Sequence, residues 1–429
     1  MIIISILFSG IALVFLFNKF SLNAWSTILA CSILAFSRAF IDYSTSGLEN
    51  PLSHFIIILF FIKFFQSSEI KDDKHLLLLS LIASFGLINR MDLFLVFLPP
   101  LLIELLNFGN FKGIKYILLG QLPFIFWELF SLIYYGYFVP NTAFAKLAHG
   151  ISRLVILNQG LTYFYNSIIN DPLTILVIIL GIIIPFLTNG KKRKSLAISA
   201  SIFLYVIYTF WIGGDFMSGR FFSVPLIMSC ISLLNAIPEF SNEQVQFLIG
   251  IILILGLSLP FNTLSLDIKE YTFNDNRIDD ERMYFFPGMS LITRYRNQMQ
   301  PDFKWKDQGI DYRDSGIRVT HAWAIGMFGY YCGPKIHIID GFSLADPLLS
   351  HLKTNNPNEL LKIGHVFKDL PEGYRESLAN GVNLITDPGI HEYYDKVMII
   401  TRGKFSNFTW ERFNTILKMN LGQYDYLIE

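Results

Sequence analysis

Residues 244–263 read QVQFLIGIILILGLSLPFNT, a 20-residue run that carries no charged side chain. About 20 consecutive apolar residues are enough to cross the hydrocarbon core of a bilayer as a helix. The run ends near Pro260, Phe261 and Asn262, and no comparable apolar run follows it. This stretch therefore marks the boundary between two unlike parts of the chain.

The two parts differ in charge. Residues 1–263 hold 27 of the 68 charged residues, about a tenth of that segment, and residues 264–429 hold 41, about a quarter. A soluble domain carries about 25% charged residues. The sequence therefore predicts a transmembrane helical bundle over 1–263 and a soluble α/β or α+β domain over 264–429. Basic and acidic residues number 34 each, so the charge balance gives no reason to expect nucleic acid as a partner.

Apolar runs recur throughout the first part and predict a polytopic α-helical bundle. We expect about ten spans, near residues 1–17, 24–42, 51–66, 75–89, 92–106, 115–137, 173–188, 194–212, 221–238 and 244–263. Several of these runs are short, and they could be tilted pairs or re-entrant segments.

The charges of the loops predict the orientation. Basic residues at 71–74, 112–115 and 191–194 fall in alternate loops, which the positive-inside rule places in the cytoplasm. The intervening loops and the C-terminal domain then face outward, and so does Met1. The outward segments would be 43–50, 138–172, 213–220 and 264–429.

Polar residues collect in the loops that are predicted to face outward. STSGLENPL occupies 44–52, NRMD occupies 89–92, YYGYFVPNTAFAK occupies 134–146 and GGDFMSGR occupies 213–220. All four would meet at one membrane face. Because functional sites are often built from several loops on one face of a rigid scaffold, we expect the site there.

The segment Gly213-Gly214-Asp215 has two interpretations. It is either a turn in which Asp215 caps the next helix, or a place where glycines let the backbone approach a ligand while Asp215 acts as a base or binds a cation. Asp215 is expected to be the carboxylate at the surface. Arg220 either holds a phosphate by a bidentate contact or extends its side chain to the interface.

Three further residues of these loops also have a structural alternative. Asn141 either helps to bind substrate or caps a helix after Pro140. Lys146 pairs either with a substrate phosphate or with lipid headgroups. Glu49 either belongs to the site or only complements the dipole of the helix that begins after it.

The C-terminal part shows short strand and helix patterns. A strand between two turns is predicted within 330–341, further strands are predicted at 384–386 and 397–400, and helices at 342–352, 357–363 and 409–419. His365 is the histidine in the most motif-like setting, although a lone histidine is more often structural. The chain contains no HxxxH or HExxH pair and its three cysteines lie far apart, so no metal site is predicted. GxSxG, P-loop and GxGxxG motifs are also absent, which gives no support to serine-hydrolase chemistry or ATP-driven transport.

Five strings together resemble one known family. They are STSGLENPL at 44–52, YYGYFVPNTAFAKL at 134–147, GGDFMSGRF at 213–221, IGMFGYYCGPKIHIIDGFSLADP at 325–347 and IGHVFKDLPEGY at 363–374. In this order they resemble the bacterial family of terminal β-(1→2)-arabinofuranosyltransferases, which also contains proteins labelled flagellar motor control proteins. The resemblance runs from about residue 35 to the C-terminus.

The resemblance implies a GT-C-type glycosyltransferase in the bacterial cytoplasmic (inner) membrane. Such an enzyme moves a sugar from a polyprenyl-phosphate donor to a cell-envelope glycan on the outer face, so its partners would be donor, acceptor and membrane lipids. No cofactor is expected, and a need for a divalent cation is open. The catalytic residue would be Asp215, and the substrate-binding residues would be Arg220, Lys146, Asn141, Glu49, Arg90 and His365.

The sequence also departs from the family pattern. An Asp-Asp-Ala-like stretch would be expected in a first outward loop, and the chain has none. Either an N-terminal span and loop are missing, or the chain has lost its usual base, and we expect transfer by this chain to be poor. Met91 stands where the family usually has proline. A non-catalytic envelope protein of the same fold, acting in surface or motility assembly, is the main alternative; a transporter is a weaker one.

Overall fold

The computed structural model describes most of the chain. The described residues are 1–66, 72–109, 111–147, 150–188, 192–258, 262–264, 277–290, 304–354, 362–402 and 409–429. Of the predicted boundary residues, Pro260 and Phe261 lie outside the described residues, as does most of the predicted helix at 357–363.

The chain forms two compact units. Unit 1 comprises Met1–Trp127, Leu157–Glu270 and Ile278–Glu281, and unit 2 comprises Glu128–Ile156, Tyr271–Arg277 and Arg282–Glu429. Residues 128–156 thus cluster with the C-terminal residues. That the C-terminal part is a soluble domain stays a prediction.

Unit 1 is helical over its described residues. Its helices are α1 (Ile2–Phe20), α2 (Ala24–Phe36), α3 (Arg38–Ser44), α4 (Asn50–Gln66), α5 (Asp73–Asn89), η1 (Met91–Leu93), α6 (Phe94–Phe108), α7 (Lys112–Gly120), α10 (Arg153–Asn170), α11 (Pro172–Leu187), α12 (Lys192–Trp211), η2 (Arg220–Phe222), α13 (Ser223–Ala236), η3 (Ile237–Glu239) and α14 (Asn242–Ser258). Helix α8 (Leu122–Tyr134) crosses from unit 1 into unit 2.

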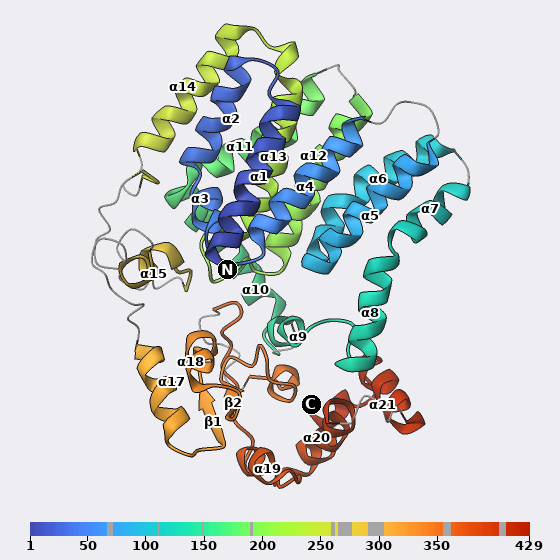
Figure 1. The fold of residues 1–429 in the computed structure, drawn as a ribbon, viewed down its shortest axis with the longest axis vertical. Helices are drawn as coiled ribbons and strands as arrows, with labels where there is room; N and C mark the ends of the chain where they lie inside the picture. The colour runs from blue at the N-terminus through green and yellow to red at the C-terminus, as the bar shows by residue number, and fades with distance from the viewer. Residues whose placement is uncertain are drawn as a thin grey trace. The chain divides into compact units, whose positions relative to one another are not determined.

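Helix α13 lies at the centre of unit 1 and packs against α4, α11 and α12 (Figure 1). Nearly all of its side chains are buried, because apolar residues surround the helix on every side. The approach to α11 is close: a Cβ on Gly181 would lie 2.4 Å from Ser229. Ser232 Oγ donates to Gly181 O at 3.0 Å across the same contact. The absence of a side chain at Gly181 therefore sets the distance between the two helices.

Several helices of unit 1 are long and apolar enough to cross a membrane. In the described part of the chain four do so alone, and up to seven spans result if each of three bent pairs is one span. Each of the ten predicted segments coincides with a helix or a bent pair. The chain is therefore a multi-pass membrane protein, and the number ten stays a prediction.

The predicted outward loop at 138–172 is largely helical, which corrects that part of the sequence prediction. It contains α9 (Asn141–Leu147) and all of α10, whose first four residues belong to unit 2, and α10 meets α11 at a bend of 109°. Asp171 causes the break, since its Oδ1 caps α11 by accepting from Thr174 N at 3.2 Å. Pro172 follows and disfavours helical backbone at the residue before it.

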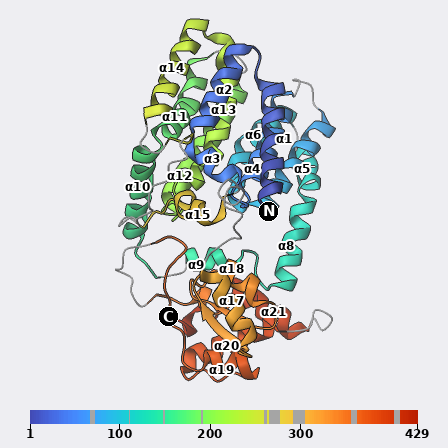
Figure 2. The same cartoon turned by 60° about the vertical axis from the view of Figure 1, so that its left-hand side comes forward.

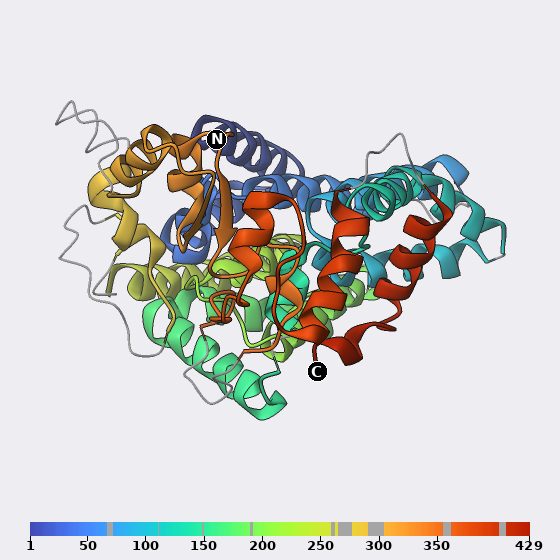
Figure 3. The same ribbon diagram turned by 90° about the horizontal axis from the view of Figure 1, so that it is seen from below.

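Unit 2 is a mixed α and β structure. Besides α9 it contains α15 (Glu281–Met289, whose first residue belongs to unit 1), α17 (Lys304–Asp314), β1 (Val319–Ala322), α18 (Ile325–Cys332), β2 (His337–Asp340), η4 (Leu349–His351), α19 (Tyr374–Asn380), α20 (Pro388–Thr401), α21 (Trp410–Asn420) and η5 (Asp425–Leu427). Helix α17 lies beside α18 (Figure 2), and α20 lies beside α21 (Figure 3).

The sheet of unit 2 has two parallel strands in its described part. Val319 of β1 pairs with His337 of β2, and Ala322 pairs with Asp340. Helix α18 connects the strands, as parallel pairing requires a crossover. The strand predicted within 330–341 is confirmed as β2, and the helix predicted at 409–419 is confirmed within one residue at each end.

Two other predicted strands are wrong. Residues 397–400 lie in α20, and residues 384–386 form no strand. The apolar run at 397–400 resembles a buried strand, but Tyr393, Val397 and Ile400 are buried at a spacing that follows the helical period. Asp387 caps this helix and Pro388 stands at its first position, and both are helix-start signals. Of the helix predicted at 342–352, only the short turn η4 forms.

Candidate functional site

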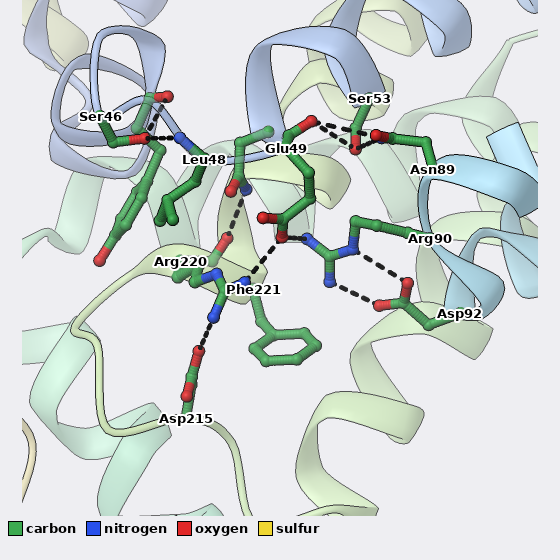
Figure 4. Close-up of polar contacts among 12 residues, drawn as sticks. Ser46, Leu48, Glu49, Ser53, Asn89, Arg90, Asp92, Asp215, Arg220 and Phe221 are labelled. Carbon is green, nitrogen blue, oxygen red and sulfur yellow. Dashed lines mark hydrogen bonds and ion pairs between the residues drawn. The ribbon is translucent and has the colours of Figure 1, made fainter. Parts of the chain in front are cut away.

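Polar residues from four places in the sequence converge at one end of the unit 1 bundle. Glu49 directly precedes α4, Arg90 directly follows α5, Asp215 follows α12, and Arg220 begins η2. These helices run in alternating directions, so the start of one lies near the end of its neighbour. We call Glu49, Arg90, Asp92, Asp215 and Arg220 the charged cluster; Figure 4 shows their side chains pointing toward one another.

Ion pairs link the cluster in a continuous chain (Figure 4). Arg220 donates through Nη1 to Asp215 Oδ2 at 2.9 Å and through Nη2 to Glu49 Oε1 at 2.7 Å. Arg90 Nη1 lies 3.3 Å from the same Glu49 Oε1. Glu49 therefore shares one carboxylate oxygen between two guanidinium groups.

Arg90 is held on several sides. It donates to Asp92 through two parallel bonds, Nε to Oδ1 at 3.0 Å and Nη2 to Oδ2 at 2.6 Å. Tyr205 Oη accepts from Arg90 Nη2 at 2.9 Å and donates to Asp92 Oδ2 at 2.7 Å. The guanidinium carbon also lies 5.1 Å from the ring centre of Phe221. Bidentate carboxylate and aromatic contacts of this kind fix an arginine in one orientation.

The carboxylates of the cluster differ in burial. The Asp215 side chain is 0% exposed and Asp92 is 9% exposed, whereas Glu49 is 23% exposed. The expectation that Asp215 lies at the surface is therefore wrong. Its role as the catalytic residue stays a prediction, and Glu49 is the carboxylate of the cluster that solvent reaches most easily.

The charge state of Glu49 follows from its two partners. Burial acts to raise the pKa of this carboxyl, but the Arg220 and Arg90 guanidiniums outweigh burial and hold the pKa below its ordinary value. Glu49 is therefore ionised at neutral pH while both arginines remain beside it.

The two glycines before Asp215 serve a close contact within the protein. Gly214 has a φ of +73°, and a Cβ there would lie 2.3 Å from the Tyr163 ring. Tyr163 Oη donates to Met217 O and accepts from Phe221 N, each at 3.2 Å. Neither of the two readings of Gly213-Gly214 is confirmed as stated: the close approach is to Tyr163, and Asp215 pairs with Arg220.

The loop at Arg90 keeps an extended backbone without the proline that the family resemblance led us to expect. Arg90 adopts φ −153° and ψ 120°, the region to which a following proline would restrict it. Met91 then begins the short turn η1. The backbone at Arg90 is therefore one that a following proline would also allow.

Several buried polar atoms beside the cluster make no hydrogen bond in the part of the chain that the structure describes. Within the described residues, Arg220 Nε, Asn50 Oδ1 and both ring nitrogens of His54 have no hydrogen-bond partner. His54 is fully buried and its ring stacks on Phe40 at 5.6 Å. Because buried polar groups are normally satisfied, such atoms call for a ligand or a water molecule.

Three predicted substrate-binding residues lie in unit 2. Asn141 Nδ2 donates to Ala345 O at 3.3 Å, Lys146 lies in α9, and the His365 ring lies 4.1 Å from the Phe342 ring. Their participation in the same site as the charged cluster stays a prediction. No group of three or more His, Cys, Asp or Glu side chains suited to hold a metal ion occurs among the residues described.

The sequence reading missed Asp92, Tyr205 and His54 as members of this region. Asp92 lies in the NRMD segment, so the arginine two residues before it was an available signal. Tyr205 and His54 lie inside apolar runs, where an aromatic ring is normally interpreted as packing. Only the fold shows that Tyr205 bridges Arg90 and Asp92.

Fold and site together define a multi-pass helical membrane protein with a buried arginine–carboxylate network at one end of its bundle. The chain is a distant homologue of the "Terminal beta-(1->2)-arabinofuranosyltransferase" of Mycobacterium tuberculosis (strain ATCC 25618 / H37Rv). The two are 26% identical over an alignment of 445 positions, which covers 83% of this chain and 68% of that protein. No protein-family model matches the chain, and no solved structure matches it.

Proposed function

We propose that the chain is a membrane glycosyltransferase of the GT-C type, which moves a sugar from a polyprenyl-phosphate donor to a cell-envelope glycan. The distant arabinofuranosyltransferase homologue and the multi-pass bundle support this assignment. The observation that carries it is the Glu49 carboxylate held between Arg220 and Arg90. A carboxylate and guanidiniums at one place supply a proton acceptor and a binding site for a phosphate.

The charges restrict how a phosphate can bind. The cluster holds two guanidiniums and three carboxylates, a net charge of −1 when all are ionised. A second anion would be repelled unless it replaced a carboxylate. Arg220 is the arginine able to make this exchange, because Arg90 is fixed by Asp92 and Tyr205 while Arg220 Nε is unused.

The exchange couples donor binding to base formation. When the donor phosphate takes the place of Glu49 on Arg220, Glu49 loses the stronger of its two cationic partners. Its pKa then rises, and the carboxylate becomes a better proton acceptor. Asp215 stays on the other edge of Arg220 and holds the guanidinium in position.

The reaction then balances as one substitution. The acceptor hydroxyl oxygen forms a bond to the anomeric carbon of the sugar, and the bond from that carbon to the phosphate oxygen breaks. The phosphate leaves with the electron pair beside Arg220, and the hydroxyl proton passes to Glu49. The retained Arg90–Asp92 pair keeps Glu49 in reach, because Arg90 contacts both carboxylates.

The test compares two carboxylate variants in the purified full chain, assayed in detergent with a set of polyprenyl-phosphate sugars. Glu49→Gln should lower turnover by about 10²–10⁴ while donor binding is kept, since removing a general base costs that much. Asp215→Asn should mainly weaken donor binding. The control is Glu243→Gln at an exposed position of α14, which should change neither quantity.

Each other outcome has a defined meaning. Turnover that survives Glu49→Gln and is abolished by Asp215→Asn would make Asp215 the base and refute the exchange. Absence of donor binding in the unmodified chain would favour the non-catalytic envelope protein of the same fold.

We further propose that the charged cluster and residues 264–429 face the outside of the cytoplasmic membrane. The support is that α12 begins at the basic segment 192–194 and ends before Asp215, so the cluster lies at the end of this helix away from the basic residues. A phosphatase fused after Glu429 should be active, and a fluorescent reporter at the same place should be dark. A bright reporter would refute the orientation.

A further inference from the structure

Aromatic side chains gather where the two parallel strands of unit 2 end. Trp323 directly follows β1, and Phe342 follows β2 by two residues. Phe367 comes from a separate loop, and its ring centre lies 4.9 Å from that of Trp323 and 5.7 Å from that of Phe342. Trp323 is 43% exposed and Phe367 is 48% exposed. We call Trp323, Phe342 and Phe367 the strand-end aromatic patch.

The tryptophan of the patch is held in place by the backbone beneath it. A Cβ on Gly341 would lie 2.3 Å from the Trp323 ring, so the indole lies directly on this glycine. The Phe342 ring contacts the indole at 5.4 Å and the His321 ring contacts it at 4.7 Å. An exposed ring that is fixed in advance loses little freedom when it binds a ligand, and this favours affinity.

The loop beside the patch is strained and tightly anchored. Asp340 Oδ1 accepts from Phe342 N at 3.0 Å, and Asp340 Oδ2 accepts from Ala345 N at 2.9 Å. Ser343, within this loop, has a φ of +63°, a left-handed conformation that is unfavourable for a non-glycine residue. Its hydroxyl is buried and has no hydrogen-bond partner in the described part of the chain. Strain that the surroundings enforce in this way often marks a functional loop.

Two polar side chains next to the patch, His321 and Lys368, present no positive charge to it. Burial lowers the pKa of His321, so its imidazole is neutral at pH 7. Lys368, the neighbour of Phe367, is buried and donates to Ser350 O at 2.9 Å. The patch therefore combines fixed apolar rings with uncharged hydrogen-bonding groups, the chemistry that a neutral polyhydroxylated ligand requires.

We propose that the strand-end aromatic patch is a saccharide-binding subsite, where sugar rings stack on Trp323 and Phe367 while the partly exposed His321 contacts hydroxyl groups. It lies beyond the carboxyl ends of parallel strands, the usual position of ligand sites in open α/β sheets. The ligand class rests on the proposed function, in which the acceptor is a glycan. A lipid surface is less suited, since Lys368 and Arg375, two described basic residues beside the patch, both donate to backbone carbonyls, those of Ser350 and Val319.

The experiment measures binding without requiring catalysis. The full chain in detergent is titrated by calorimetry with synthetic oligo-arabinofuranosides, and with glucan oligosaccharides of equal length for comparison. Trp323→Ala should weaken oligo-arabinofuranoside binding at least about tenfold, since it removes the main stacking surface. Trp323→Phe should retain most of the affinity, and Gly341→Ala should weaken it because the added methyl displaces the indole.

The matched control is Trp410→Ala in α21. Trp410 is 79% exposed and pairs with Phe413 at 5.4 Å, but it lies on a helix and not at the strand ends. This variant should bind as the unmodified chain does. A circular dichroism spectrum shows whether each variant is folded.

The outcomes separate this inference from the proposed function. Turnover with unchanged binding in Trp323→Ala would refute the subsite and leave the glycosyltransferase intact. Saccharide binding that is lost in Trp323→Ala without any turnover would support the subsite and refute the enzyme. Binding of anionic lipid vesicles, instead of either saccharide, that Trp323→Ala abolishes would assign the patch to the membrane and refute the subsite.

Discussion

Removal of Arg220 tests whether the charged cluster is a single coupled unit. Arg220→Met keeps most of the side-chain volume and removes the charge between Asp215 and Glu49. Asp215 is fully buried and would lose the cationic partner Arg220, and breaking a buried pair in this way costs about 3–5 kcal/mol. We expect the free energy of unfolding to fall by about that amount, measured by urea titration in mild detergent.

The double variant decides the cause. Asp215→Asn together with Arg220→Met should recover part of the lost free energy of unfolding, because the buried carboxylate that Arg220 neutralises is then removed as well. The effects of the two single variants should therefore fail to add by about 1 kcal/mol or more. The control is Arg313→Met, which breaks an exposed pair with Asp314 and should give no measurable change. Additive effects of Asp215→Asn and Arg220→Met would refute the idea that the pair is a coupled element.

Three other changes test features of the two units. Gly214→Ala should destabilise the chain by at least about 2 kcal/mol, since the φ of +73° and the contact with Tyr163 both oppose a side chain, and a thermal melt in detergent measures this. The folded pKa of Glu49 is depressed, so its carboxylate stabilises the folded chain at neutral pH, and this contribution is lost as the pH falls below about 4.5. Glu49→Gln should remove the contribution, so the free energies of unfolding of the variant and of the unmodified chain, measured from pH 6 to 3, should converge at the acid end. Burial lowers the pKa of Lys368 to about 8, so between pH 8 and 10.5 the unfolded state binds more protons than the folded state, and the free energy of unfolding rises with pH. Lys368→Met should flatten that rise. An equal slope in the variant and the unmodified chain would contradict this prediction.

Apolar runs predicted the helices of unit 1 well, because a helix that meets either the bundle or lipid on every side needs a long uncharged segment. The run at 244–263 and helix α14 illustrate this. The bend between α10 and α11 was missed, although Asp171 and Pro172 are a cap and a helix-start signal. Helix α10 contains polar side chains, so it lacks the continuous apolar run that predicts a membrane span.

The candidate site was predictable where polar residues interrupt apolar runs. Glu49, Arg90, Asp215 and Arg220 were found in this way, and the structure joins them by direct ion pairs. Burial was not predictable, because a loop residue such as Asp215 is normally exposed. It is enclosed here since Arg220 folds back over it and Gly214 lies against Tyr163, and neither contact follows from local sequence.

The sharing of Glu49 between two arginines also has a consequence for biosynthesis. Arg90 lies 41 residues after Glu49, but Arg220 lies 171 residues after it. At about 5–20 residues per second, the ribosome delivers Arg220 roughly 6–26 s after Arg90. During that interval Glu49 can pair with Arg90, whereas the carboxylate of Asp215 does not yet exist. The early helices α4 and α5 can therefore be joined by one ion pair before α12 and α13 enter the membrane, and the arrival of Arg220 then locks the four helix ends together.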